Sequence, residues 1–553
     1  MKRIILIIFL LLTLLILNNS YAATNADYCQ VPPYVVQNVP SNIMIIVDTS
    51  GSMFNLAYSD GFETTTIGDD NNCSASGTPC TGFTNPGAYP TYKYYGYFDP
   101  DYWYTYTSNR FITTAPKTGS GITGERAKAA AEWDGNFLNW LTMRRVDVVR
   151  KVLTGGKTTT GEGTGYDRLI GEKADCDSRG LYKQIATVEN YVDNTYSGTR
   201  CLKVITAGGA CSGGGSGTSD FEISASSSCT DTFGSNYNVG VRVPSPVEGV
   251  LQNVVGTKAR LGLTFYNVST GGKVIVSVGG TSLSSMVNQI NNTRPDSNTP
   301  LAETLWTVAG YFGQVNEFQG YDAGAVGTYG PQYSTGTSYT INNTNDPYNQ
   351  GTGGSPRWPA CTKSYVLLIT DGEPCADGSV PSGILDYAQT AGSSFNCGTP
   401  NATTYCPAAT ATAPETYSFP AATFPSCGAG GYVAGLEDVA LWAHTKDLRN
   451  YNTLGGTANS GAINGTQNLN LYVVSAFGKG STLLRYAAIN GGFEDSNANN
   501  LPDLQSEWDK DGNNEPDTYY EAYDGYELET GIKNALSTML KRASSGTAAS
   551  VLA

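Results

Sequence analysis

The feature that most constrains the fold is a run of five apolar residues, Ile43–Val47, followed directly by Asp48-Thr-Ser-Gly-Ser52. A short run without polar residues predicts a strand buried on both faces, as in a parallel sheet covered by helices. We therefore expect an α/β fold. In such sheets, ligands bind in the crevice beyond the carboxyl ends of the strands. The oxygen-bearing residues after this run are therefore candidates for a ligand site.

The D-x-S-x-S pattern supplies one carboxylate, from Asp48, and two hydroxyls, from Ser50 and Ser52. Hard cations such as Mg²⁺ prefer oxygen ligands and keep some coordination positions for water or for a partner's carboxylate. The pattern therefore predicts a metal-ion-dependent adhesion site. The alternative is a turn whose small polar side chains bond to their own backbone.

Two later segments have the character that such a site needs. Ser364–Asp371 is a second apolar strand ending in a carboxylate, and Thr299 stands just before a helix opened by Pro300. In order and character, the three segments resemble the von Willebrand factor type A domain. The resemblance leaves Mg²⁺, Mn²⁺ and Ca²⁺ open as the ion. It implies five residues that hold the metal directly or through a bound water: Asp48, Ser50, Ser52, Thr299 and Asp371.

Strand and helix patterns alternate over most of the chain. We predict strands at 43–48, 259–267, 273–278, 364–371 and 469–477. We predict helices at 133–153, 300–312, 432–449, 481–488 and 526–542. The alternation indicates one Rossmann-like domain with a doubly wound sheet over residues 42–490, before a C-terminal helix and tail at 522–553.

Long Gly-, Ser-, Thr- and Tyr-rich stretches interrupt this pattern at about 54–130, 155–255, 313–360 and 373–430. Stretches of this length are usually functional or disordered, so we interpret them as insertions carried on one domain. A separate small disulfide-rich domain is the alternative for the second stretch. The first stretch holds the aromatic-rich segment Tyr94–Tyr106, which predicts a small core for the insertion in preference to a recognition surface.

All 12 cysteines follow residue 22, most of them in these stretches. An even number of cysteines in an exported protein predicts disulfides that staple the long insertions. The sequence contains no C-x-x-C motif. It therefore argues against redox catalysis and against a cysteine-rich zinc site.

The first 22 residues combine a basic start, Lys2 and Arg3, with an apolar core and small residues at Ser20 and Ala22. This pattern predicts a cleaved secretory signal at 1–22, followed by an N-terminal segment at 23–41. The alternative is an uncleaved membrane anchor, for which the apolar core is short. We expect the mature chain outside the cytoplasm. The formal net charge of −15 disfavours nucleic acid and anionic membranes as partners, and it concentrates divalent cations.

Residues 491–521 contain a tandem repeat with a period of 14 residues. Each unit has oxygen-bearing side chains at relative positions 1, 3, 5 and 9, the spacing with which a tight loop wraps around Ca²⁺. Neither unit is an ordinary EF-hand: the first has Asn500 at the mid-loop glycine position, and in both units the glutamate, Glu507 or Glu521, stands one place later than that loop requires. An acidic, exposed linker is the alternative. The predicted Ca²⁺ ligands are Asp495, Asn497, Asn499, Asp503, Asp509, Asp511, Asn513, Asp517 and Glu521.

Several ordered motifs resemble the PilY family of type IV pilus assembly proteins and pilus-tip adhesins. The resemblance rests on Asn136–Asp147, Val149–Gly156, Thr299–Ala302, Thr370–Gly372, Asp438–Ala440, Asp447–Arg449, Gly491–Phe493, Trp508–Gly512 and Pro516–Asp517. It implies a protein of the periplasm, outer membrane, cell surface or pilus tip that works with minor pilins. A host or abiotic surface ligand with an acidic group is a further option. Family members usually continue into a C-terminal β-propeller, which we do not expect here because the sequence ends at Ala553.

The leading hypothesis is a non-enzymatic assembly and adhesion module whose metal site binds an acidic group on a partner. One alternative is a purely structural pilus-tip or outer-membrane component whose metals only stabilise the fold. The other is an exported metal-dependent hydrolase. The single histidine, His444, lies in a helical pattern and is interpreted as structural, which disfavours a Ser-His-Asp triad.

Overall fold

A computed structural model describes most of the chain that follows the predicted export signal. The described residues are 39–58, 93–117, 128–172, 181–205, 219–228, 232–267, 271–295, 297–314, 332–333, 346–351, 357–359, 361–372, 374–375, 377, 380–381, 383–398, 435–449, 463, 465–478 and 481–545. The predicted signal at 1–22 lies outside them. None of the helices in this described part combines the length and the apolar character that a membrane crossing requires.

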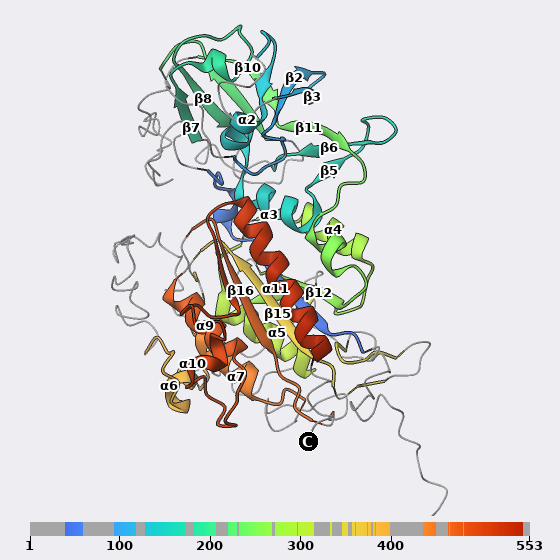
Figure 1. Ribbon diagram of the computed structural model, residues 1–553, viewed down its shortest axis with the longest axis vertical. Coiled ribbons are helices and arrows are strands. Elements are labelled where there is room, and N and C mark those ends of the chain that lie inside the picture. Colours follow the sequence, from blue (N-terminus) through green and yellow to red (C-terminus); the bar gives the residue numbers. More distant parts are fainter. Residues whose placement is uncertain are drawn as a thin grey trace, which may run out of the picture.

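The apolar segment around Ile43–Val47 forms the central strand, β1, of a seven-stranded sheet (Figure 1). The sheet order is β14-β13-β12-β1-β15-β16-β17. All five predicted strands are present, and the result is the predicted mixed α/β fold. The strands are β1 (Asn42–Val47), β12 (Arg260–Tyr266), β13 (Gly272–Val276), β14 (Gln332–Tyr333), β15 (Ser364–Thr370), β16 (Asn470–Ala476) and β17 (Tyr519–Ala522).

The sheet has doubly wound connectivity. Leaving out the two-residue strand β14, the strands taken in chain order occupy positions 3-2-1-4-5-6 across the sheet. β1 is parallel to both β12 and β15, and β13 alone among these six runs antiparallel to its neighbour β12. The carboxyl ends of β1 and β15 therefore meet at the same edge of the sheet.

Both faces of the sheet are covered, which explains why β1 contains no polar residue between Ile43 and Val47. Ile43, Ile45 and Val47 belong to one buried cluster, while Met44 and Ile46 belong to another. Helices α3 (Arg145–Thr154), α4 (Leu283–Asn292) and α11 (Gly525–Ser545) contribute to the first cluster. Helices α5 (Leu301–Gly313), α7 (Leu436–Thr445) and α9 (Thr482–Gly492) contribute to the second.

A second unit, drawn above the seven-stranded sheet in Figure 1, lies between β1 and β12 in the chain. We call its described residues within 93–244, other than α3, the inserted unit. A six-stranded sheet contains β2 (Tyr102–Thr107), β3 (Arg110–Pro116), β4 (Trp133–Asp134), β5 (Thr158–Thr159), β6 (Tyr166–Ile170) and β11 (Gly240–Pro244). A four-stranded sheet contains β7 (Leu181–Ile185), β8 (Arg200–Ile205), β9 (Asp220–Ser224) and β10 (Phe233–Asn238).

The inserted unit joins two stretches that the sequence analysis treated as separate insertions. β3 belongs to the first stretch and β11 to the second, and the two strands pair in parallel through Phe111 and Val241. The aromatic segment of the first stretch forms a core, as the sequence analysis predicted. Tyr94, Phe98 and Tyr104 are buried, and the Phe98 ring lies against Tyr104 and Phe111.

The single helix predicted at 133–153 is wrong. The chain forms β4, then α2 (Gly135–Thr142), and then α3, with Met143 and Arg144 extended between the two helices. Backbone pairing with the segment that follows Ser52 causes the break. The N–H of Ala57 donates to Met143 O at 2.9 Å, and the N–H of Arg145 donates to Asn55 O at 3.0 Å. These bonds bring the start of α3 next to the loop that follows β1.

Four of the cysteines lie among the described residues. Cys201, Cys375 and Cys397 are disulfide-bonded, and Cys361 is a free thiol. The other eight cysteines lie outside the described part of the chain. The stapling of each insertion by its own disulfide therefore stays a prediction.

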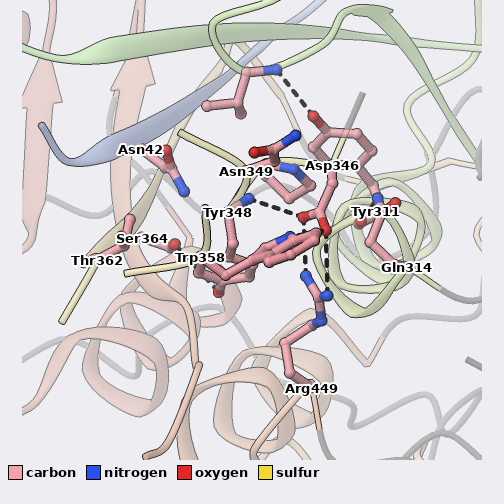
Figure 2. Close-up of polar contacts among 12 residues, drawn as sticks. Asn42, Tyr311, Gln314, Asp346, Tyr348, Asn349, Trp358, Thr362, Ser364 and Arg449 are labelled. Carbon is pink, nitrogen blue, oxygen red and sulfur yellow. Dashed lines mark hydrogen bonds and ion pairs between the residues drawn. The ribbon is translucent and has the colours of Figure 1, made fainter. Parts of the chain in front are cut away.

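A buried ion pair anchors the end of the third stretch (Figure 2). Arg449 Nη1 lies 2.9 Å from Asp346 Oδ1, and Arg449 Nη2 lies 3.2 Å from Asp346 Oδ2. The Asp346 carboxylate also accepts bonds from the Trp358 indole N–H at 2.8 Å and from the Tyr348 backbone N–H at 2.9 Å. The Tyr348 hydroxyl lies 3.2 Å from the hydroxyl of Ser364, the first residue of β15. The pair thus fixes this segment beside the amino end of β15.

Asp438 in α7 gives the stability of the fold a pH dependence. Burial first, and then the neighbouring Glu437 carboxylate, raise its pKa from 3.8 to about 9, although Asp438 Oδ1 accepts a bond from Ala388 N–H at 2.7 Å. The pKa of Asp438 is higher in the folded chain than in the unfolded chain. Between about pH 4 and about pH 9, the folded chain therefore binds one proton more than the unfolded chain. The stability that this proton contributes is present below about pH 4 and is lost as the pH rises through about 9.

We expect Asp438→Asn, which imitates the protonated side chain, to flatten this dependence. The gap in unfolding free energy between the variant and the unmodified chain should grow with pH by at most about 1.4 kcal/mol per pH unit. Denaturant midpoints of the variant and the unmodified chain, measured at about pH 5 and about pH 8.5, check this prediction. Asp101→Asn, at a carboxylate whose side chain is 54% exposed, is the matched control. Parallel pH curves for all three proteins would contradict the prediction.

Candidate metal site at the end of strand β1

Asp48 and Asp371 meet at the carboxyl ends of the neighbouring strands β1 and β15. The hydroxyls of Ser50 and Ser52 lie 2.7 Å apart, and Ser52 Oγ donates to Asp371 Oδ1 at 2.7 Å. The backbone N–H of Ser50 donates to Asp48 Oδ1 at 2.7 Å, and that of Asp371 donates to Asp48 Oδ2 at 3.2 Å. Four of the five predicted site residues therefore form one connected set.

Both carboxylates of this set are withdrawn from solvent. Asp48 is 2% exposed, and the side chain of Asp371 has no exposed area. Burial first, and then the negative charge of Asp371, raise the pKa of Asp48 from 3.8 to about 7, against the opposing effect of bonds from Ser50 and Thr370. A divalent cation bound here would offset both the burial and the repulsion. The donor set, carboxylates and hydroxyls only, fits a hard cation such as Mg²⁺.

Thr299 lies in a segment that runs beside the Asp48 loop. It is 7% exposed, and its carbonyl accepts a bond from the N–H of Cys375 at 2.9 Å. Two residues earlier, Ser297 pairs with Ser50 in a parallel bridge, and Ser297 Oγ donates to Thr49 O at 2.8 Å. The structure therefore brings the Thr299 segment to the site, while the role of Thr299 as a metal ligand stays a prediction.

The sequence analysis missed two residues of this site. Thr370 Oγ1 donates to Asp48 Oδ2 at 2.8 Å, and Arg145 Nη1 donates to Asp371 Oδ2 at 3.0 Å. Thr370 precedes Asp371 at the end of the predicted strand, so the position itself was a usable signal. Arg145 is 226 residues away from Asp371 in the chain, and no local pattern indicates that they meet.

The two units of the tandem repeat have the same local geometry. The first aspartate of each unit accepts bonds from the N–H groups four and five residues further on, at 3.2 and 2.8 Å for Asp495 and at 3.1 and 2.8 Å for Asp509. The residue five positions on is Asn500 or Asn514, and both are left-handed, with φ of 62° and 66°. Asparagine tolerates this conformation better than most residues, which explains a turn without glycine at that position.

The two units differ in how they arrange their oxygens. In the first, the amides of Asn497 and Asn499 each donate to Asp503 at 2.9 Å. Glu521 lies on β17, where its Oε1 accepts a bond from the Tyr519 hydroxyl at 3.0 Å. The second unit gathers three carboxylates whose oxygens lie within 4.8 Å of one another: Asp509, Asp511 and Asp517. Ca²⁺ binding by either unit stays a prediction.

Comparisons with known proteins point to one group of relatives. Residues 87–222 match the family model described as "PilY1 homolog, small alpha/beta domain", a range that covers most of the inserted unit. A 63-residue segment is 40% identical to a protein of Xylella fastidiosa named type IV pilus biogenesis factor PilY1 homolog. That alignment covers 11% of this chain and 4% of the Xylella protein. No solved structure shows a significant match to this chain. Over part of its length, the chain is therefore similar to PilY1-related proteins.

Proposed function

We propose that this chain is an exported, non-enzymatic factor of type IV pilus biogenesis that binds a partner through a metal-ion-dependent adhesion site. The observation that carries the proposal is the convergence of Asp48, Ser50, Ser52 and Asp371 at adjoining strand ends. The pilus assignment is supported by the similarity to PilY1 homologs. The sheet order 3-2-1-4-5-6, with its antiparallel β13, supports a von Willebrand factor A core.

In this proposal Asp48, Ser50 and Ser52 ligate Mg²⁺, Thr299 lies in or next to the coordination shell, and Asp371 holds a bound water. Mn²⁺ and Ca²⁺ are alternative ions. The bound cation supplies an open coordination position for an acidic group. The partner is a minor pilin or another component of the pilus tip, or a surface ligand with an acidic group. The site is proposed to act in the periplasm, at the outer membrane or at the cell surface.

The environment of the single histidine supports a non-enzymatic role. A metal-dependent hydrolase needs a positioned general base or nucleophile. His444 is 8% exposed, its Nδ1 lies 3.0 Å from Leu469 O, and burial lowers its pKa, so it is a packed core residue. The purely structural alternative stays open to test, because a metal that only stabilises the fold would use the same ligands.

Counting surface pili by electron microscopy tests the proposed function. Cells that lack the chain are complemented with the unmodified gene, with Asp48→Ala or with Asp386→Ala, which changes an exposed aspartate in the turn before helix Tyr387–Ala391. We expect the unmodified gene and Asp386→Ala to restore pili and Asp48→Ala to fail. Normal pilus numbers in the deletion would reject an assembly role.

A second measurement separates adhesion from structural support. Asp48→Ala is purified and its denaturant midpoint is compared with that of the unmodified chain in Mg²⁺ and in chelator. A variant that folds normally but does not bind the minor pilins supports a docking metal. A variant that loses stability in Mg²⁺ and still binds the pilins in chelator supports the structural alternative.

We further propose that Ca²⁺ orders the tandem repeat. The double variant Asp509→Asn/Asp517→Asn should lower the melting temperature by several degrees more in Ca²⁺ than in chelator, because a bound ion stabilises only the folded chain. Thermal unfolding followed by circular dichroism checks this. The control is Asp193→Asn, in a turn of the inserted unit where Asp193 Oδ1 accepts a bond from Thr195 N–H. Equal destabilisation with and without Ca²⁺ would refute Ca²⁺ binding by the second unit.

A further inference from the structure

Arg145 places a positive charge directly against the candidate metal site. Its Nη1 lies 3.0 Å from Asp371 Oδ2, while the other oxygen of Asp371 accepts the bond from Ser52. The Arg145 side chain is 16% exposed and that of Asp371 has no exposed area. An ion pair that is largely shielded from water is screened less than a surface pair, so this guanidinium strongly affects the charge at the site.

The location of Arg145 on its helix is unusual. Arg145 is the first residue of α3, where the partial positive charge of the helix disfavours a cation. Its backbone N–H donates to Asn55 O in the loop after Ser52, and its guanidinium carbon lies 5.7 Å from the ring centroid of Phe477, just past the end of β16. Local helix preference does not explain an arginine at this position. The ion pair with Asp371 offsets the unfavourable interaction of its charge with the start of the helix.

The charges show what this arginine does for the site. Asp48 and Asp371 together carry two negative charges when ionised, and Arg145 neutralises one of them. A divalent cation that enters the site therefore meets one net negative charge instead of two. It must also share Asp371, directly or through water, with the guanidinium. Both effects weaken cation binding.

We propose that Arg145 is an internal counter-ion of the metal site, which pairs with Asp371 and lowers the affinity of the site for a divalent cation. The inference rests on the proposed metal site. It adds that a divalent cation competes with Arg145, the first residue of α3, for the Asp371 carboxylate. A metal-loaded site that keeps this arginine carries one net positive charge, which favours an acidic partner group.

Isothermal titration of the full chain with Mg²⁺ tests the proposal. The same titration of Asp48→Asn reports Mg²⁺ bound elsewhere, including the tandem repeat, and the difference defines binding at the site. We expect Arg145→Gln to bind Mg²⁺ at least tenfold more tightly than the unmodified chain, and Arg145→Lys to lie between them. Arg357→Gln, which removes an equal charge from an exposed residue in the segment before β15, should leave the affinity unchanged.

A double-variant cycle in chelator gives a readout that does not depend on the metal. Unfolding free energies of the unmodified chain, Arg145→Gln, Asp371→Asn and the double variant define the coupling between the two side chains. We expect a favourable coupling in chelator that diminishes in saturating Mg²⁺. This measurement also reveals an Arg145→Gln variant that does not fold, in which case Arg145→Lys carries the comparison.

The outcomes separate the two proposals. Mg²⁺ binding that requires Asp48 but is equally tight in Arg145→Gln would overturn the counter-ion role and leave the metal site standing. The absence of any Asp48-dependent binding in every variant would overturn the metal site and the counter-ion role with it. Coupling of the same size with and without Mg²⁺ would show that the cation does not compete for Asp371, and would also overturn the inference.

Discussion

Replacing Asp346 with alanine is expected to lower the free energy of unfolding by about 3–5 kcal/mol, because it leaves the Arg449 guanidinium buried without its carboxylate. The side chains of Arg449 and Asp346 are 1% and 0% exposed. The variant also removes the acceptor for the Trp358 indole and for the Tyr348 N–H. The change is measured by denaturant unfolding, as a shift of the midpoint with no change in the slope of unfolding free energy against denaturant concentration.

An exposed ion pair provides the matched control for this prediction. Lys93 and Asp101 lie 2.6 Å apart, and both side chains are 54% exposed. Asp101→Ala should therefore cost less than about 1 kcal/mol, since solvent screens exposed pairs. If Asp346→Ala costs no more than Asp101→Ala, the buried pair does not anchor its segment as we describe.

The second large effect is expected for Gly249→Ala, where the chain returns from the inserted unit. A Cβ at this position would lie 2.4 Å from the backbone carbon of Leu153 and 2.4 Å from the backbone nitrogen of Thr154. These atoms belong to the last turn of α3 and cannot rotate away as a side chain could. We expect a loss of about 3 kcal/mol in unfolding free energy, at the upper end of the range for overpacking.

Gly383→Ala is the control for Gly249→Ala, because a Cβ at Gly383 would meet nothing within 4 Å. It should be neutral, or stabilise by up to about 1 kcal/mol through the unfolded chain. A similar stability for both variants, measured by the same denaturant titration, would show that α3 does not pack tightly against the returning chain.

The sequence predicted the central sheet and most of the candidate site because their signals are local. Residues 43–47 and 366–369 are apolar without interruption, since both faces of the sheet are covered. The carboxylates that follow them, Asp48 and Asp371, then had to meet at the sheet edge because the two strands are parallel and adjacent. The period of the tandem repeat likewise reappears as two matching turns.

Other features could not be predicted because they depend on distant partners. The apolar pattern over 133–153 is compatible with one helix, and only the pairing of Ala57 with Met143 divides it. The six-stranded sheet combines strands from two stretches with β4 from the segment between them, so neither stretch alone carries its pattern. The contact between Arg145 and Asp371 requires both the divided helix and the sheet.

The central position of β1 also determines when the domain can assemble during synthesis. Asn42 at the start of β1 pairs with Arg260 on one side and with Ser364 on the other. This apolar strand is therefore synthesised before both of the strands with which it pairs. The inserted unit must be made before either neighbour is available. Pairings this far apart in the chain fold slowly and leave apolar segments exposed to aggregation. A nascent chain of this protein therefore passes through a long interval in which residues 43–47 are exposed without either partner strand.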